Sequence, residues 1–106
     1  MSKTAENLQH AFSGESQVNR KYLAYAQKAE DDGYPQVAKL FRAISAAESI
    51  HALNHLRIMG DVKSTAENLE QAIRDENYEV TTMYPEFMQD AEHEEEKKAL
   101  RSFRWA

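Results

Sequence analysis

Three glutamates occupy positions where amphipathic helices should be apolar: Glu15, Glu48 and Glu76. Glu48 is followed three residues later by His51, so both side chains leave one face of a helix, one turn apart. Metal-binding helical bundles hold their ions with this Glu-x-x-His spacing. Burying several carboxylates without counter-charges is costly, and a pair of divalent ions offsets that cost compactly. The spacing therefore predicts a site for two metal ions.

Each of these residues also has a simpler interpretation. Glu15 would lie at the edge of a bundle with its carboxylate in water. Glu48 would form a hydrogen bond with His51 inside a polar core. His55 lies four residues after His51 and would extend a metal site, but an exposed histidine at the bundle end is the stronger expectation. Because several ligand-type residues recur in register, the sequence as a whole favours the metal interpretation.

Two long helices are expected in the first half of the chain. The first should begin with Thr4 as its N-cap and run to about Asp31, because Gly33 follows. The second should run from about Pro35 to Gly60. Apolar residues recur at helical spacing in both segments. Helices of this length suit a bundle better than a compact mixed fold.

A third helix is expected to start at Ser64, which forms a capping box with Glu67. Pro85 lies inside its apolar pattern and has no backbone donor, so a kink or local bulge is predicted there. The charged residues 93–98 predict a solvated turn or the start of a helix, and a last helix is then expected from Ala99. The chain is thus expected to form three long helices and a fourth that has barely begun.

An internal repeat relates the two halves of the chain. The segment Thr4-Ala5-Glu6-Asn7-Leu8 recurs 61 residues later as Thr65-Ala66-Glu67-Asn68-Leu69. The same offset carries Glu15 onto Glu76. The first metal-type glutamate is therefore repeated together with the start of its helix.

The repeat organises the predicted fold. Two copies of a helix hairpin, residues 4–60 and 64–106, would pack as an antiparallel four-helix bundle, a single all-α domain over residues 1–106. The offset places a second Glu-x-x-His just beyond Ala106, so the fourth helix is expected to be incomplete. Either a longer chain or a dimer would cover the apolar faces left open. The longer chain is favoured because no C-cap glycine precedes the end.

Composition excludes several classes of protein. The chain has 106 residues, 42% of them hydrophobic, and only three glycines and two prolines, which leaves little room for a turn-rich β fold. It has no cysteine, which excludes a disulfide framework, a thiolate zinc site and an iron–sulfur or rubredoxin-type centre within it. A net charge of -5 argues against nucleic acid and anionic membranes as partners. With no apolar signal core or long apolar run, a cytoplasmic location is expected.

Five short motifs resemble those of a known family. They are Ser13-Gly14-Glu15-Ser16-Gln17, Asn19-Arg20-Lys21-Tyr22, Glu48-Ser49-Ile50-His51-Ala52, Asp75-Glu76-Asn77-Tyr78-Glu79 and Met83-Tyr84-Pro85-Glu86-Phe87. The family is the rubrerythrins, of the ferritin-like superfamily, and the resemblance covers nearly the whole chain. Its most specific part is a Glu-x-x-Glu on the third helix with a tyrosine eight residues past the first glutamate.

The resemblance implies a ferritin-like bundle with a non-haem di-iron site that reduces hydrogen peroxide to water. Five residues would ligate the two irons directly: Glu15, Glu48, His51, Glu76 and Glu79. Two tyrosines would form hydrogen bonds with ligating carboxylates and are the candidate catalytic residues: Tyr22 and Tyr84. The simpler interpretations are an exposed flank for Glu79 and core aromatic packing for the tyrosines.

The expected chemistry follows from this ligand set. Carboxylates and imidazole suit iron or manganese, with zinc as a possible substitute, and bridging glutamates keep two such ions a few ångströms apart. Each ferrous ion would give one electron to peroxide, and an external donor would then reduce the ferric pair. Glu76 is expected to bridge the ions, and Glu79 to move on or off a metal with redox state.

Two departures from the family pattern shape the expected partners. The second Glu-x-x-His is absent, so one iron lacks its closing ligands within this chain. Many rubrerythrins carry a rubredoxin domain, whose iron needs four cysteines, and this chain has none. The electron donor is therefore expected to be a separate rubredoxin-like protein, with hydrogen peroxide as substrate and a homodimer or higher oligomer as the assembly.

Two other functions fit the same residues. A ferritin-like ferroxidase would use these ligands to oxidise iron(II) with oxygen and pass it on for storage. A metal-free helical interaction module would bind no iron at all. Stopped-flow comparison of peroxide with oxygen separates the first from a peroxidase, and metal analysis of the purified protein separates the second.

Overall fold

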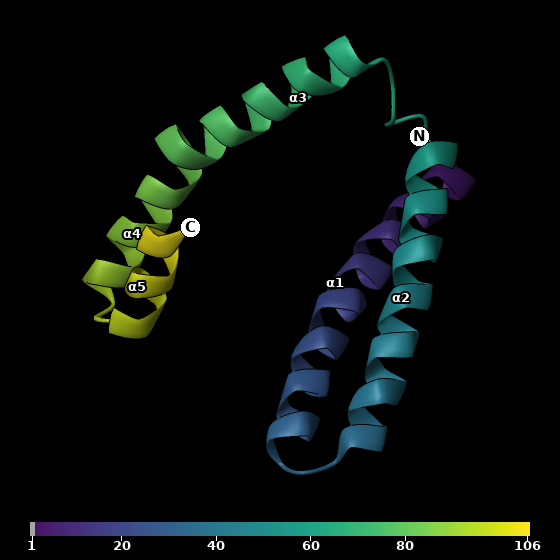
Figure 1. Ribbon diagram of the computed structural model, residues 1–106. Helices are drawn as coiled ribbons and strands as arrows, with labels where there is room; N and C mark the ends of the chain where they lie inside the picture. Colours follow the sequence, from purple (N-terminus) through teal and green to yellow (C-terminus); the bar gives the residue numbers. More distant parts are fainter. Residues whose placement is uncertain (1) are drawn as a thin grey trace. The chain divides into compact units, whose positions relative to one another are not determined.

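A computed structural model describes residues 2–106 (Figure 1). Every regular element in this range is helical, which confirms the all-α prediction. The chain divides into two compact units, Met1–Val62 and Lys63–Ala106. The elements in chain order are α1 (Lys3–Asp31), α2 (Pro35–Ile58), α3 (Thr65–Tyr78), the π-helical turn η1 (Glu79–Met83), α4 (Tyr84–His93) and α5 (Lys97–Trp105).

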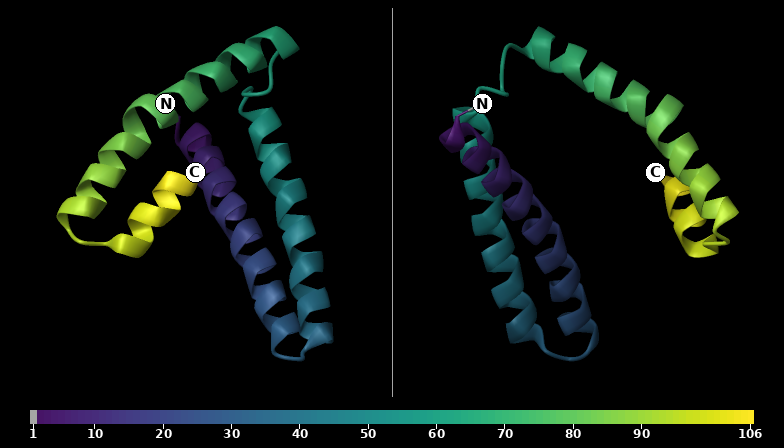
Figure 2. Two further views of the ribbon diagram at one scale, coloured as in Figure 1. Left: turned by 60° about the vertical axis from the view of Figure 1, so that its left-hand side comes forward. Right: turned by 180° about the vertical axis from the view of Figure 1, so that it is seen from behind.

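The first unit is an antiparallel hairpin of α1 and α2 (Figures 1 and 2). Its turn requires the left-handed conformation of Gly33, whose φ is 86°. The Tyr34 N–H donates to the Ala29 carbonyl at 2.8 Å, and the Gly33 N–H donates to the Glu30 carbonyl at 3.1 Å. These two bonds satisfy carbonyls that the end of α1 would otherwise leave free. Pro35 then starts α2, where its missing N–H costs nothing.

The first helix begins earlier than the sequence predicts. Its N-cap is Ser2, whose side chain accepts a hydrogen bond from the Ala5 N–H at 3.1 Å. The prediction of Thr4 as N-cap was therefore wrong. Both residues are good caps, and the Ser2 cap adds residues to the helix that can continue its backbone hydrogen bonding.

Small residues form the core of the hairpin. Ala26, Ala29 and Ala38 are buried together at the turn end of the two helices, and Phe41 packs against them. Alanine at these positions lets the two backbones approach closely, while Phe41 fills the space beside them. The core therefore fixes how α1 and α2 lie against each other.

In the second unit α3, η1 and α4 follow one another without a break, as one long helix with an internal π turn. Ser64 caps its start, accepting from the Glu67 N–H at 3.2 Å, as predicted. The predicted bulge at Pro85 is also confirmed, because η1 ends just before it and the Tyr84 N–H bonds to the Glu79 carbonyl. Proline supplies no N–H and its ring crowds the preceding turn, so the helix locally widens.

The charged segment after α4 forms a tight turn around Glu95, whose φ is 60°. The Glu95 N–H donates to the Glu92 carbonyl at 3.2 Å, and the Glu96 N–H donates to the Ala91 carbonyl at 2.8 Å. The same two hydrogen bonds close the turn at Gly33, but here Glu95, which has a side chain, takes the position of the glycine. The next helix starts at Lys97 rather than at Ala99, because lysines continue a helix readily.

Replacing Glu95 by glycine is expected to stabilise the second unit by about 0.5–1 kcal/mol. A left-handed residue with a Cβ is strained by about 1–2 kcal/mol, and glycine loses part of that gain to its greater freedom when unfolded. Glu94, the C-cap, has φ -86° and ψ 1°, so its replacement by glycine should not stabilise. Denaturant unfolding of the two variants checks the prediction, and equal effects of both would contradict it.

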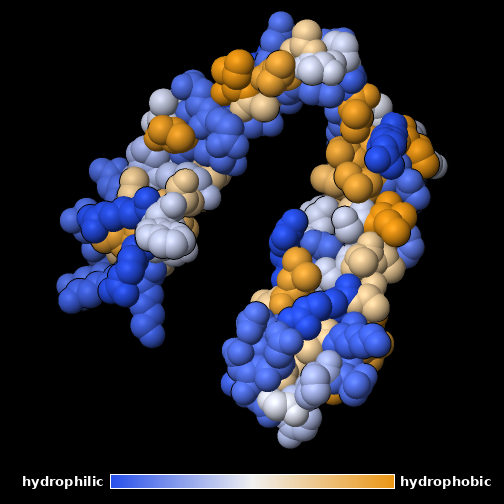
Figure 3. Space-filling view, viewed as in Figure 1, coloured by the Kyte–Doolittle hydropathy of each residue, from blue (hydrophilic) through white to orange (hydrophobic). Residues whose placement is uncertain are grey.

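Apolar side chains lie on the surface of α3 in the second unit (Figure 3). Leu69, Ile73 and Val80 are each more than half exposed, although they form the apolar stripe expected for this helix. Such a stripe gains its stability by packing against another helix.

None of the helices within residues 2–106 has both the length and the hydropathy needed to cross a membrane.

Candidate metal centre

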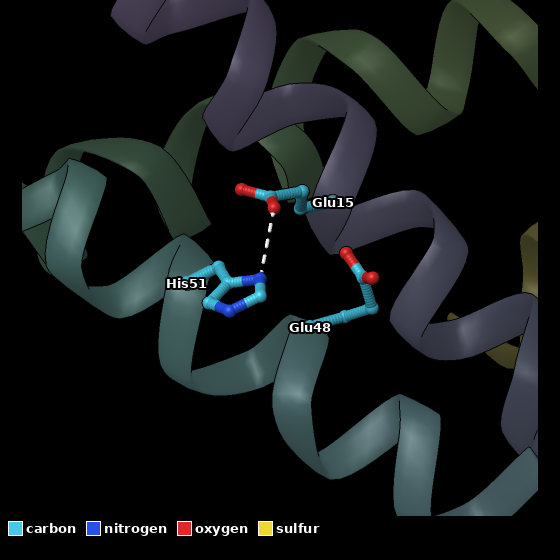
Figure 4. Close-up of side chains that lie close together, drawn as sticks. All are labelled: Glu15, Glu48 and His51. Atoms are coloured by element: carbon cyan, nitrogen blue, oxygen red, sulfur yellow. Dashed lines mark ion pairs between the residues drawn. The ribbon is translucent and has the colours of Figure 1, made fainter.

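The structure brings Glu15, Glu48 and His51 together between α1 and α2 (Figure 4). Each offers one ligand-type atom, and these three atoms lie within 4.8 Å of one another. Opposite ligands of one transition-metal ion lie about 4.2 Å apart, because each bond is about 2.1 Å long. A small adjustment of side chains would therefore let all three residues hold one ion.

Local helix geometry explains this convergence. Glu48 and His51 are three residues apart on α2, so they leave the same face of the helix one turn apart. Glu15 lies on α1, which runs antiparallel beside α2, and its carboxylate points toward His51 (Figure 4). Two residues from one helix and one from its neighbour thus converge without any loop.

A polar clasp next to the site holds the two helices in register. The Asn19 side-chain nitrogen donates to the Ser45 carbonyl at 2.7 Å and lies 3.0 Å from Ser45 Oγ. In return, Ser45 Oγ donates to the Asn19 carbonyl at 2.9 Å. Asn19 is one turn from Glu15, and Ser45 is one turn from Glu48, so sliding of either helix would break the clasp before it could separate the candidate ligands.

Glu15 lies between two histidines of α2. Its Oε1 is 3.2 Å from His51 Nδ1, and its Oε2 is 2.7 Å from His55 Nε2. The Glu15 side chain is 25% exposed and that of His55 is 28% exposed, whereas His51 is 54% exposed. The expectation that His55 is a solvent-exposed histidine at the bundle end was therefore wrong, because the Glu15 carboxylate covers it.

One atom of this cluster tests whether a cation fits. Glu15 Oε2 is buried and has no hydrogen-bond partner among the described residues, despite the nearby His55 nitrogen. Buried carboxylate oxygens without a partner are rare, because losing water without compensation is costly. A divalent ion beside the carboxylate would compensate it. The donor set of carboxylate oxygens and imidazole nitrogens suits first-row transition metals.

Glu76 and Glu79 belong to the second unit, on α3 and η1. Glu76 is exposed and Glu79 is half-buried within the chain as described. Glu79 opens the π turn, and π turns inside helices occur frequently at functional sites. That these two residues share a site with Glu15 stays a prediction.

The π turn also bears on the tyrosine of the second unit. In a regular helix, eight residues would leave Tyr84 about 80° around the axis from Glu76. The extra residue of one π turn makes the spacing resemble seven residues, which brings the two within about 20° of the same face. Tyr84 packs against Phe87 and Phe103 at ring-centroid distances of 6.2 and 6.1 Å.

Tyr22 is placed by aromatic contacts in the first unit. Its ring lies 5.9 Å from that of Tyr25 and 5.6 Å from that of Phe41, measured between centroids. Among the described residues its hydroxyl makes no hydrogen bond to Glu15 or Glu48. Aromatic contacts therefore position both candidate tyrosines, and their roles toward ligating carboxylates stay predictions.

Two residues of this centre were not singled out from the sequence. Ser45 is buried and lies three residues before Glu48, so its place on the ligand face of α2 was visible in the helical spacing. Its partner Asn19 opens one of the five family-like motifs, Asn19-Arg20-Lys21-Tyr22, but that motif does not indicate a contact with Ser45. For His55 the signal was its four-residue distance from His51, which indicates a shared face but not how deeply it is buried.

Comparison with known proteins gives a consistent result. The family model described as rubrerythrin matches residues 6–106. The chain is 36% identical to a rubrerythrin of Porphyromonas gingivalis, over 97% of this chain and 58% of the relative. It is 34% identical to rubrerythrin-2 of Clostridium acetobutylicum, over 97% of this chain and 64% of the relative, and 34% identical to nigerythrin of Nitratidesulfovibrio vulgaris, over 94% and 56%. The chain thus spans about three fifths of the length of these relatives.

Proposed function

The chain belongs to the rubrerythrin family, and from this premise we propose that it is a non-haem di-iron peroxidase that reduces hydrogen peroxide to water. The observation that supports the proposal most directly is the convergence of Glu15, Glu48 and His51, which each place one ligand-type atom within 4.8 Å of the other two. One carboxylate oxygen of Glu15, Oε2, is also buried without a hydrogen-bond partner among the described residues. The all-α helices and the two hairpins agree with the ferritin-like fold of this family.

In the proposed site the protein supplies charge and geometry. Glu15 and Glu48 would contribute two negative charges and His51 a neutral nitrogen from the first unit. Glu76 and Glu79 would add two more carboxylates, so that four carboxylates match the charge of two divalent ions. Tyr22 and Tyr84 would each form a hydrogen bond with a ligating carboxylate and hold it in one orientation.

The reaction is a two-electron reduction. When bound, two iron ions would supply one electron each, and peroxide with two protons would give two molecules of water. A rubredoxin-like protein is proposed to return the electrons. A homodimer or higher oligomer is proposed as the assembly. The cytoplasmic location stays a prediction.

Stopped-flow kinetics of the iron-loaded, reduced chain tests the proposal. Peroxide is expected to oxidise the iron at least about tenfold faster than oxygen at equal concentration, a difference of about 1.4 kcal/mol in the barrier. One molecule of peroxide should oxidise two ferrous ions. The matched control is His10→Gln, which alters an exposed histidine of α1 and should react as the unchanged protein does.

Two results would contradict the proposal. Faster oxidation by oxygen than by peroxide would favour iron oxidation for storage, as in a ferroxidase. Failure of the purified chain to retain iron, together with no change in thermal stability on adding iron(II), would favour a metal-free interaction module.

A further inference from the structure

The line of contact between α1 and α2 consists of small residues with one polar layer in it. On α2 the buried positions recur every seven residues, at Ala38, Ser45 and Ala52. Ala38 belongs to one buried cluster with Ala26 of α1, and Asn19 stands seven residues before Ala26. Seven residues are about two helical turns, so Asn19 and Ser45 form the next layer of the same line. Ser45 is 1% exposed, which places the polar pair inside an otherwise apolar contact.

This pair defines the register of the two helices more sharply than alanines can. Contacts between methyl groups have no direction, so they survive a small shift or rotation of one helix. Hydrogen bonds depend on both distance and angle. The Asn19 side chain donates to the Ser45 carbonyl, and the Ser45 hydroxyl donates to the Asn19 carbonyl, so each side chain contacts the backbone of the other helix. A polar residue in the apolar seam of a coiled coil sets the register in the same way.

The turn of the hairpin controls the far part of the helices poorly. Gly33 is 18 residues from Glu15, which corresponds to about 27 Å of helix. A change of about 10° in the angle between the helices at the turn would move Glu15 by about 4–5 Å over that length. Within residues 2–106, the remaining side-chain hydrogen bond between α1 and α2 joins Arg42 to Glu30 at 2.6 Å, close to the turn. It therefore cannot fix the position of Glu15 either.

The candidate ligands lie just beyond the clasp, on the side away from the turn. Glu15 precedes Asn19 by four residues, and Glu48 follows Ser45 by three, which is about one helical turn in each case. His51 lies one further turn along α2. Of the hydrogen bonds that join α1 to α2 in the described part of the chain, those of the clasp are thus nearest to the ligands in sequence.

We propose that Asn19 and Ser45 are positioning residues of the metal centre, which hold Glu15 of α1 opposite Glu48 and His51 of α2. The role rests on the proposed centre and extends it to two residues that hold no ion themselves. Groups that orient ligands from outside the coordination sphere typically change metal affinity by about 10–100-fold.

The clasp should matter more for metal binding than for folding. A hydrogen bond adds little net stability, because water satisfies the same groups in the unfolded chain. Removing both partners together is nearly neutral, since no buried donor or acceptor is left unpaired. Alanine is also a better helix former than asparagine or serine. Replacing both residues by alanine should therefore leave a folded hairpin whose ligands are no longer held in one arrangement.

Cobalt(II) binding to the full chain tests the inference, with Asn19→Ala and Ser45→Ala combined in one variant. The double variant should bind cobalt about 10–100-fold more weakly and with an altered visible absorption spectrum, while its unfolding midpoint stays close to that of the unchanged chain. In the metal-free chain, the proton–proton NOEs between Glu15 and His51 should weaken or vanish. The matched control is Arg42→Gln, which removes an ion pair between the same helices close to the turn. It should keep the affinity, the spectrum and the NOEs.

Three results would overturn the inference. The first is unchanged cobalt affinity, spectrum and NOEs in the double variant, which would leave the proposed metal centre standing. The second is an equal loss of affinity in the double variant and in Arg42→Gln, because the clasp would then act only through the general stability of the hairpin. The third is a failure of the unchanged chain to bind cobalt, which would remove the proposed centre as well. If the double variant does not fold, Ser45→Ala alone, which removes only a hydroxyl, should show the same changes to a smaller degree, and their absence would also overturn the inference.

Discussion

Replacing Glu15 by glutamine is expected to lower metal affinity by more than about a hundredfold. Protein sites with four ligands bind zinc with about 10–16 kcal/mol, so one ligand accounts for roughly 3 kcal/mol, and each 1.4 kcal/mol is a factor of ten. The contribution of Glu15 to the free energy of metal binding should exceed this average, because its carboxylate contacts both His51 and His55. Glutamine has nearly the same shape, so the hairpin itself should remain folded.

Thermal unfolding with and without cobalt(II) measures this effect. Metal that binds only the folded chain stabilises it by about 4 kcal/mol at a thousandfold excess over the dissociation constant, and the Glu15 variant should lose nearly all of that increase. The control is Glu6→Gln, an exposed acid in the first turn of the same helix. It should cost at most about 1 kcal/mol through the helix dipole and leave metal binding unchanged. Equal metal-induced stabilisation of both variants would contradict the assignment.

The features of the fold that were predictable from sequence are local ones. The ends of α1 and α2 depend on Gly33 and Gly60, which adopt positive φ values of 86° and 78° that other residues avoid. The start of α3 depends on a serine followed by a glutamate at capping-box spacing, and the π turn on the missing N–H of Pro85. Each signal acts over about one helical turn, so it could be recognised without knowing the rest of the structure.

The errors at helix ends have the same physical origin. Ser2 and Thr4 are both able to cap a helix, and the difference between two good caps is only a few tenths of a kcal/mol. Likewise, residues 93–98 fitted either a solvated turn or a helix start, and the last helix begins at Lys97, two residues before the expected Ala99, because lysine is a good helix former. Where two local preferences are nearly equal, the sequence alone does not decide the boundary.

The candidate site was only partly predictable. Glu48 and His51 share a helix, so their spacing alone places them together. The position of Glu15 opposite them, and the burial of His55 behind it, depend on how α1 lies against α2. That register is set by the Asn19–Ser45 clasp and by the small core residues, which act between helices rather than along one. Sequence periodicity contains no information about it.

The second large effect is expected at Glu76, which the internal repeat relates to Glu15. Its neighbours on the apolar stripe, Ile73 and Val80, are more than two-thirds exposed, and Glu76 makes no ion pair among the described residues. A carboxylate in the middle of such a stripe would face a partner helix when the stripe is covered, where an unpaired charge is costly. A bound metal ion would neutralise it, which is the reason to place Glu76 in the proposed site.

Replacing Glu76 by alanine in the full chain is therefore expected to abolish binding of the two metal ions. The affinity for metal should fall by more than about a hundredfold. The stability of the metal-free protein should instead stay the same or rise by up to about 0.5 kcal/mol, because alanine is the better helix former and is apolar. Isothermal titration with cobalt(II) and metal-free unfolding measure the two quantities. Glu70→Ala, at an exposed position of the same helix, should share the second effect but not the first. If Glu76→Ala lowers the cobalt affinity while the stability of the metal-free protein stays the same or rises, the lost affinity reflects a lost ligand rather than misfolding. An unchanged cobalt affinity would instead confine the metal centre to the α1–α2 hairpin.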